Sequence, residues 1–249
     1  MASSQNLSVQ SICATLQRDY SACDISDALL KLNVPAAGFL VDLAPLQGLS
    51  RKPHRIVAPV STVVLVPKSW SDASSFVPPL PQASNIPQGK NWTDCPPPGA
   101  VVLIQQPKEH ISAILGDIMV TRLQKRGILG VVADGRIRDL KSCREVCEEG
   151  SFQAWSTGVS AAPPSLEAKP WAYDISLKVG DVTVNPGDIL CADEEDGAVV
   201  VIPKAQLQAV YKLLPVLKRA SDGVLADVQK GFSLPEAVQR HPDFYSNYK

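Results

Sequence analysis

The sequence predicts a single α/β domain with helices at both ends, and three observations support this fold class. Residues 100–147 alternate strand, helix, strand and helix, an order that implies parallel strand pairing. Residues 175–202 hold short β-branched segments separated by Gly, Pro and Asp, which indicates antiparallel pairing. Apolar residues recur at helical spacing near both ends of the chain. There is no internal repeat, so we expect one domain over residues 1–249.

The composition excludes several classes of protein. Net charge is -1 at pH 7, so no global field attracts nucleic acid or an anionic membrane. No apolar run is long enough to cross a bilayer, and the first residues lack a signal-peptide pattern. We therefore expect a cytoplasmic protein with reduced cysteines and no nucleic-acid or membrane partner. Cys143 and Cys147 share a helix face and are interpreted as buried apolar side chains.

The first part of the chain predicts two helices, over residues 8–20 and 26–32. Ser26 or Asp24 can serve as the N-cap of the second helix. A β-branched run at residues 55–66 predicts a buried strand.

Proline shapes the next part of the chain. Pro59 is expected to interrupt the strand at residues 55–66. Residues 68–99 contain seven prolines, a density that excludes a long helix or central strand. We expect a long ordered loop that covers a site or contacts a neighbouring subunit.

The middle of the chain predicts strands at residues 100–105 and 128–133, with helices at 116–126 and 139–147. The second half predicts further elements, each bounded by turn or capping residues. They are strands at 175–179, 182–184, 189–192 and 198–202, helices at 206–218 and 221–230, and a short helix at 235–240 capped by Ser233. Glu194 to Asp196 are interpreted as a solvated turn.

A helix start behind Gly116 is the first candidate binding feature. The backbone N–H groups of Asp117, Ile118 and Met119 are expected to have no partner within the helix. They lie at the positive end of the helix dipole, so they can hold a carboxylate or a phosphate.

Residues 134–139 (DGRIRD), after the strand at 128–133, are the second candidate feature. Ligands of open α/β folds bind beyond the carboxyl ends of strands. Arg138 can grip a carboxylate through two hydrogen bonds, and Asp139 can hold a hard cation such as Mg²⁺. The alternative is an Arg–Asp surface pair with an aspartate as helix N-cap.

The spacing of these residues resembles the RraA-like family and its 4-hydroxy-4-methyl-2-oxoglutarate aldolases. Asp117, a twenty-residue gap and the pair Arg138-Asp139 are similar to the signature of that family. The resemblance runs from Leu16 to His241 and is weakest in the proline-rich loop. Further similar blocks are 25–29 (ISDAL), 116–119 (GDIM), 130–135 (GVVADG), 185–189 (NPGDI) and 192–203.

The resemblance implies a three-layer β/β/α sandwich of the RraA-like type. It also implies a homotrimer or hexamer with the site at the subunit interface. In the family pattern, Asp139 binds Mg²⁺ or Mn²⁺ directly and Asp117 holds one of the metal's waters. Arg138 binds the substrate carboxylate, helped by the N–H groups of Ile118 and Met119 behind Gly116.

These roles imply a metal-dependent lyase for 2-oxo acids. Cleavage of 4-hydroxy-4-methyl-2-oxoglutarate and decarboxylation of oxaloacetate both give pyruvate enolate, whose charge a divalent cation stabilises. The alternative is a non-catalytic binding regulator, a role known in the same family. Retention of Asp117, Arg138 and Asp139 favours the enzyme.

Two further acids match positions that the family supplies partly from a neighbouring subunit. Asp27 matches an early acidic position where aldolases carry glutamate, and Asp222 approximately matches a late one. They would hold a water that acts as the base. Both also suit simple helix-start aspartates. Shorter acids here predict that Asp27→Glu raises the ratio of aldolase to decarboxylase activity.

Overall fold

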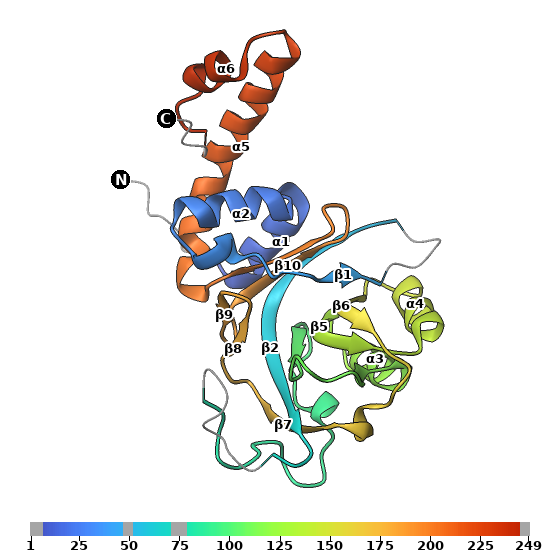
Figure 1. Ribbon diagram of the computed structural model, residues 1–249. Helices are drawn as coiled ribbons and strands as arrows, with labels where there is room; N and C mark the ends of the chain where they lie inside the picture. The colour runs from blue at the N-terminus through green and yellow to red at the C-terminus, as the bar shows by residue number, and fades with distance from the viewer. Residues whose placement is uncertain (1–6, 47–51, 71–78, 245–249) are drawn as a thin grey trace.

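The computed structural model describes residues 7–46, 52–70 and 79–244, which form one α/β domain (Figure 1). Its centre is a nine-stranded, curved sheet with the strand order β1-β6-β5-β3-β2-β10-β11. In addition, β4 pairs with β5, β7 pairs with β2, and β8 and β9 form a separate hairpin. Strands β2, β3, β5 and β6 are parallel, whereas β10 and β11 are antiparallel. The predicted α/β class with a parallel and an antiparallel part is confirmed.

The elements have the following bounds. The helices are α1 (Val9–Asp19), α2 (Ala22–Lys31), α3 (Asp117–Lys125), α4 (Leu140–Glu148), α5 (Leu207–Gln229) and α6 (Leu234–Arg240). The strands are β1 (Ala44–Pro45), β2 (Arg55–Pro67), β3 (Val101–Gln105), β4 (Ala113–Leu115), β5 (Gly130–Ile137), β6 (Gln153–Val159), β7 (Ala168–Tyr173), β8 (Leu177–Val179), β9 (Val182–Val184), β10 (Ile189–Asp193) and β11 (Ala198–Ile202).

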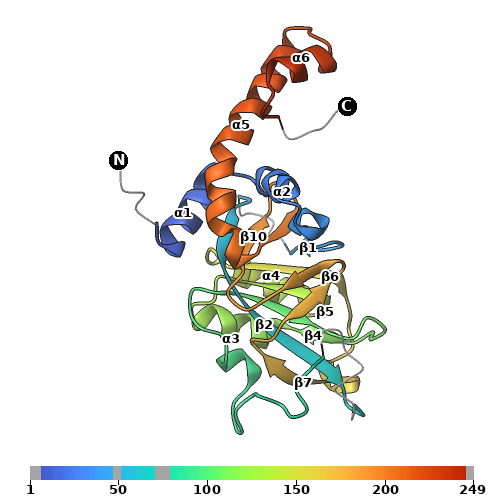
Figure 2. The ribbon, with the colours of Figure 1, turned by 90° about the vertical axis from the view of Figure 1, so that its left-hand side faces the viewer.

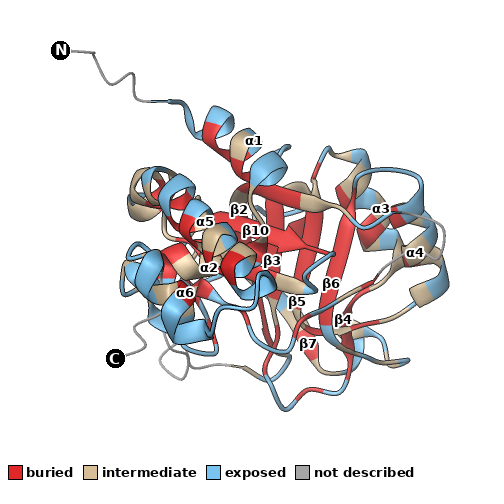
Figure 3. Cartoon of the chain, turned by 90° about the horizontal axis from the view of Figure 1, so that it is seen from above, coloured by how far each residue is buried: buried red, intermediate tan, exposed pale blue. Residues whose placement is uncertain are grey.

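Strand β2 contributes to three hydrophobic cores because its side chains alternate between the two faces of the sheet. Ala58 and Val64 face the inside of the curved sheet. Val63 and Leu65 pack in the core covered by α3 and α4, and Val57 packs in the core covered by α1, α2 and α5. Figure 3 shows the buried strands between α2 and α5 on one side and α3 and α4 on the other. This layering agrees with the three-layer architecture that the resemblance implied.

The predicted interruption at Pro59 is wrong, because β2 runs unbroken from Arg55 to Pro67. Pairing with β10 ends at Pro59, where Ile189 is opposite, and pairing with β3 begins at Val60. The proline, which has no N–H to donate, therefore lies where the strand changes partners.

The two predicted helices at 206–218 and 221–230 are a single helix, α5. Pro215 lies inside it on the exposed side. A continuous buried stripe through Leu214, Leu217, Ala220 and Val224 joins the two halves. The helix persists because this stripe packs along its whole length, which outweighs one missing backbone hydrogen bond.

The second helix begins earlier than predicted. Ser21, not Ser26 or Asp24, is the N-cap of α2, and Asp24 completes a capping box with it. The cap of α6 at Ser233 is confirmed, with Glu236 as its capping-box partner.

Four strands, β1, β4, β6 and β7, were not predicted from the sequence. The predicted strand at 128–133 also extends to Ile137, so residues 134–137 belong to β5 rather than to a following loop. The predicted solvated turn at 194–196 is wrong for Glu194, which is buried and accepts a hydrogen bond from the His54 backbone.

Residues 79–99 of the proline-rich segment form an ordered loop. Trp92 is buried in the core beneath α3 and α4. The Trp171 indole donates to the Pro81 carbonyl, and Asn85 bonds the backbone of Tyr173 in β7. The loop therefore lies over β7, as an ordered surface loop should, while residues 71–78 are outside the described part.

The C-terminal helices project from the body of the domain. Figures 1 and 2 show the distal half of α5, with α6 beside it, extending beyond the sheet. The buried Asp227 carboxylate on α5 holds α6 through Arg240 and His241, at 3.3 and 3.1 Å.

Candidate functional site

Two helix starts lie side by side at one edge of the sheet. Strand β4 leads into α3 and strand β5 leads into α4. The two strands pair in parallel, with Leu115 opposite Ile137, and the Arg138 N–H donates to the Leu115 carbonyl at 3.0 Å. Parallel pairing places the carboxyl ends of both strands together, so Gly116 and Arg138 are adjacent. The two candidate features of the sequence therefore form one site.

Gly116 lies against the Arg138-Asp139 pair. A methyl group at residue 116 would lie 2.7 Å from Asp139 Oδ2 and 3.2 Å from Arg138 Cγ. The Arg138 Nε donates to Asp139 Oδ2 at 2.9 Å. These side chains are 34% and 35% exposed, so solvent and ligands reach them. A side chain at position 116 would therefore require the Asp139 carboxylate to move.

Asp139 has an uncommon backbone conformation, with φ 57° and ψ 43°. It is the N-cap residue of α4, yet its side chain makes no capping hydrogen bond. The left-handed conformation costs about 1–2 kcal/mol for a residue other than glycine. The alternative interpretation, an Arg–Asp pair with Asp139 as helix N-cap, is therefore confirmed for the ion pair with Arg138. It is wrong for the side chain of Asp139, which does not cap the helix.

The start of α3 differs from the expected open cradle. The Ile118 N–H donates to the Asp117 carboxylate at 2.7 Å, and the Met119 N–H donates to the Gly116 carbonyl at 3.1 Å. An anionic ligand would have to displace the Asp117 carboxylate from the Ile118 N–H. The Ile118 side chain is 76% exposed beside this position.

Cys143 lies beneath the site. Its thiol donates to the Arg138 carbonyl, with an Sγ to O distance of 3.4 Å. Burial, and then the nearby Asp117 carboxylate, raise the pKa of Cys143 to about 12. Cys143 and Cys147 are both buried in the core below α3 and α4, as predicted, and Cys143 is a neutral thiol.

A surface hollow of about 590 Å³ adjoins the pair, lined by Arg138, Asp139, Leu140, Val159, Ser160 and Ala161. It is large enough for a small dicarboxylic acid. Among the described residues, no group of three or more His, Cys, Asp or Glu side chains has the arrangement of a metal site. Asp139 and Ser160 bring side-chain oxygen atoms to the hollow, and the Asp117 carboxylate lies at the adjoining helix start, outside this lining.

Asp27 and Asp222 lie elsewhere in the chain. Asp27 is on α2 and Asp222 is on α5, two helices that pack together in the helical layer away from α3 and α4 (Figures 1 and 2). Asp222 is exposed and pairs with Lys218 at 3.4 Å. Burial and the neighbouring Asp24 raise the pKa of Asp27 to about 6. One chain alone does not bring these two acids to Arg138 and Asp139, so their role in the site stays a prediction.

The fold and the site together define a class of protein, namely a single α/β domain with an arginine–aspartate pair at two adjoining helix starts. That class is the RraA-like family, to which the chain belongs, because the family model described as Aldolase/RraA matches residues 22–200.

Individual relatives are more distant. Protein DlpA of Legionella pneumophila is 24% identical over 218 residues, which are 87% of this chain and 32% of DlpA. A Halalkalibacterium halodurans protein named "Putative 4-hydroxy-4-methyl-2-oxoglutarate aldolase" is 30% identical over 115 residues, 46% of this chain and 51% of that protein. The chain thus spans about a third and about half of the lengths of these relatives.

A solved structure shares the fold. RraAS2 of Streptomyces coelicolor, described as an unusual member of the RNase ES inhibitor RraA protein family, has a TM-score of 0.65 and 24% identity. The match covers 85% of this chain and 95% of RraAS2. In the part of the chain that the structure describes, no helix is both long and apolar enough to span a membrane.

Proposed function

We propose that the chain is a divalent-metal-dependent carbon–carbon lyase that releases pyruvate from small 2-oxo acids. The candidate substrates are 4-hydroxy-4-methyl-2-oxoglutarate and oxaloacetate. The observation that carries the proposal is the contact between Gly116 and the Arg138-Asp139 pair beside an open hollow. Membership of the family and the partial match to a protein named as an aldolase support it.

Arg138 is suited to hold the substrate carboxylate. Among the described residues its hydrogen bond runs through Nε to Asp139, so both Nη amino groups are left for a ligand. Two parallel N–H donors match the geometry of a carboxylate. Asp139 also fixes the guanidinium plane, which lowers the entropy lost when the substrate binds.

The residues present fit a hard divalent cation. Asp139 supplies an oxygen donor whose position Gly116 leaves clear, and the expected role of Asp117 is to hold a water of the cation. Mg²⁺ or Mn²⁺ would act as a Lewis acid for the negative charge that develops on the 2-oxo oxygen.

Retro-aldol cleavage also needs a base for the C4 hydroxyl, whereas decarboxylation does not. The expected base is a water held by Asp27, whose pKa is raised to about 6, so that this carboxylate can take a proton from the water near neutral pH. Asp27 would reach the hollow from a neighbouring subunit of a homotrimer or hexamer, together with Asp222. In that case, Asp27→Asn and Asp139→Ala are each inactive alone. Mixing the two variants, so that their subunits exchange, restores part of the aldolase activity, because some interfaces then combine an intact Asp27 from one subunit with an intact Asp139 from its neighbour.

The test is pyruvate release from each of the two substrates, with Mg²⁺ and with a chelator. Metal-dependent release from either supports the lyase. If neither substrate gives metal-dependent pyruvate, the non-catalytic binding regulator is the remaining reading of this family member.

A further inference from the structure

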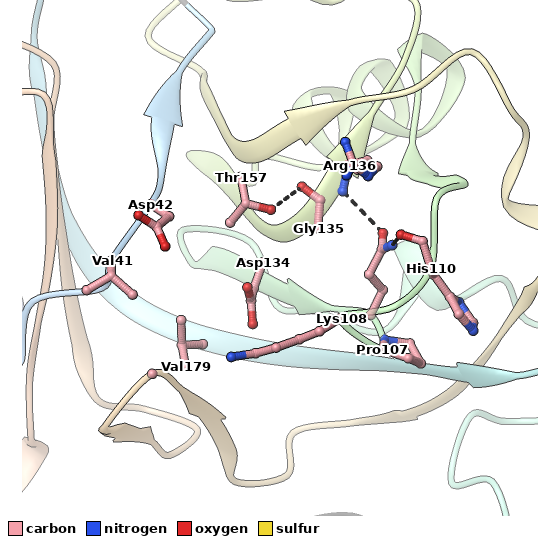
Figure 4. Close-up of a pocket in the computed structure, with 12 residues that line it drawn as sticks. Val41, Asp42, Pro107, Lys108, His110, Asp134, Gly135, Arg136, Thr157 and Val179 are labelled. Atoms are coloured by element: carbon pink, nitrogen blue, oxygen red, sulfur yellow. Dashed lines mark hydrogen bonds between the residues drawn. The ribbon is translucent and has the colours of Figure 1, made fainter.

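A second cavity, of about 620 Å³, lies at the carboxyl ends of β3, β5 and β6 (Figure 4). Its walls come from the loop after β3, from residues 134–136 of β5, and from two turns at Val41-Asp42 and Val179-Gly180. It shares no lining residue with the hollow beside Arg138. The carboxyl ends of parallel strands are the usual place for ligands in α/β folds.

Four charged side chains line this cavity and are not used by the proposed lyase, namely Asp42, Asp134, Lys108 and Arg136. The Arg136 guanidinium donates to the Val159 carbonyl at 3.2 Å. Figure 4 shows the Lys108 side chain passing below Asp134 with its ammonium toward Val179, and Asp42 on the turn at the upper left of the view. No direct ion pair joins Lys108 to either acid among the described residues. The space between them can therefore take a charged ligand.

The wall of the cavity is held rigidly. The buried Gln106 amide accepts from the Arg136 N–H at 3.1 Å and donates to the carbonyls of His110 and Ser112. A methyl group at Gly135 would lie 2.5 Å from Gln106 Oε1, so this close approach requires glycine. The cavity is thus formed before any ligand arrives.

The Asp134 carboxylate can accept further hydrogen bonds from a ligand. It is anchored by the Gln105 amide at 2.8 Å through one oxygen, Oδ2. Burial raises its pKa, Lys108 acts against that rise and Asp42 adds to it, so the three charges influence each other across the cavity. An ammonium group placed between Asp42 and Asp134 would offset the cost of burying the Asp134 carboxylate and the repulsion between the two carboxylates.

The charges select one class of ligand. A simple anion bound to Lys108 would also face the carboxylates of Asp42 and Asp134, and the polar lining does not suit an apolar compound. A bare metal cation between Asp42 and Asp134 would also face the Lys108 ammonium. We propose that this cavity binds a small zwitterion of amino-acid size, its ammonium between Asp42 and Asp134 and its carboxylate on Lys108.

The test uses isothermal titration calorimetry on the full chain with glycine, L-serine and L-glutamine. Ethylammonium and acetate, each carrying one of the two charges, are the matched probes. We expect at least one amino acid to bind, and each half-probe to bind about tenfold more weakly or worse. Lys108→Met and Asp134→Asn should each weaken amino-acid binding about tenfold.

Both cavity variants are expected to fold. Asp134→Asn keeps an acceptor for the Gln105 amide, and Lys108→Met changes an exposed side chain. Lys212→Met, on the exposed side of α5, should leave binding unchanged. The proposal is overturned if no amino acid binds, if ethylammonium binds as well as the amino acids, or if both cavity variants bind like the wild type.

Discussion

The carboxylate of Asp139 lies so close to Gly116 that a β-carbon at residue 116 would lie 2.7 Å from Asp139 Oδ2. Gly116→Ala is therefore expected to push the carboxylate out of place. A displacement near 1 Å at a reacting site costs about 100-fold in rate, and we expect kcat/KM for oxaloacetate to fall by that order.

The matched control for Gly116 is Gly150→Ala, where the nearest atom to a new methyl group is Gln124 Nε2 at an ordinary 3.6 Å. Gly150→Ala should keep full activity, and thermal unfolding should show that both variants fold. Wild-type activity in Gly116→Ala would contradict the role given to this contact.

Because Asp139 has a left-handed backbone, we expect glycine at this position to be more stable than alanine, the reverse of the order inside a helix. At φ 57° alanine is strained and glycine is not, so Asp139→Gly should be more stable than Asp139→Ala by about 0.5–1 kcal/mol. At the exposed Glu145, inside the same helix, glycine should be less stable than alanine by about 1 kcal/mol. Urea denaturation measures both pairs. If glycine were less stable than alanine at both positions, the backbone of Asp139 would carry no strain. Both Asp139 variants should be inactive.

Asp27 predicts a pH-dependent stability. Its pKa is raised from 3.8 to about 6 in the folded chain, so the folded state holds the proton more tightly than the unfolded state. The free energy of unfolding should fall, through this group, as pH rises from 3.8 to about 6. Asp27→Asn removes that loss, so its advantage over the wild type should grow across this window and then level off. An advantage that is equal at both ends of the window would rule out the raised pKa.

We expect Asp227 to anchor α6 to α5. This buried carboxylate contacts Lys230, Arg240 and His241, so Asp227→Asn should loosen α6 without affecting the sheet. Hydrogen exchange of residues 234–240 should become about tenfold faster. The control Asp222→Asn, on the exposed side of the same helix, should leave exchange unchanged. Unaltered exchange in Asp227→Asn would mean that apolar packing, and not this cluster, holds α6.

Much of the fold could be predicted because periodicity and capping are local. The strand at β3 and the helices α3 and α4 follow directly from apolar spacing. The three-residue strand β4 could not be predicted, since Ala113 to Leu115 are too few to show alternation. The continuity of α5 past Pro215 depends on packing against other elements, which the local sequence does not contain.

The site could be predicted in part. Spacing pointed to Gly116, Arg138 and Asp139, and β4–β5 pairing explains why they meet. The left-handed backbone of Asp139 and the contact of Asp117 with the Ile118 N–H depend on tertiary geometry. The cavity between Asp42, Lys108 and Asp134 joins three segments distant in sequence, so no linear motif reveals it. Whether Asp27 and Asp222 reach the site depends on a neighbouring chain.

In the proposed function, Asp139 holds a catalytic divalent cation beside Arg138. The most direct measurement is pyruvate formation from oxaloacetate by the wild type and Asp139→Asn, each with Mg²⁺ and with a chelator. We expect Mg²⁺-dependent activity in the wild type that is lost on chelation and is absent in Asp139→Asn at every Mg²⁺ level. If Mg²⁺-dependent activity survives in Asp139→Asn, the cation is bound elsewhere and Asp139 does not hold it.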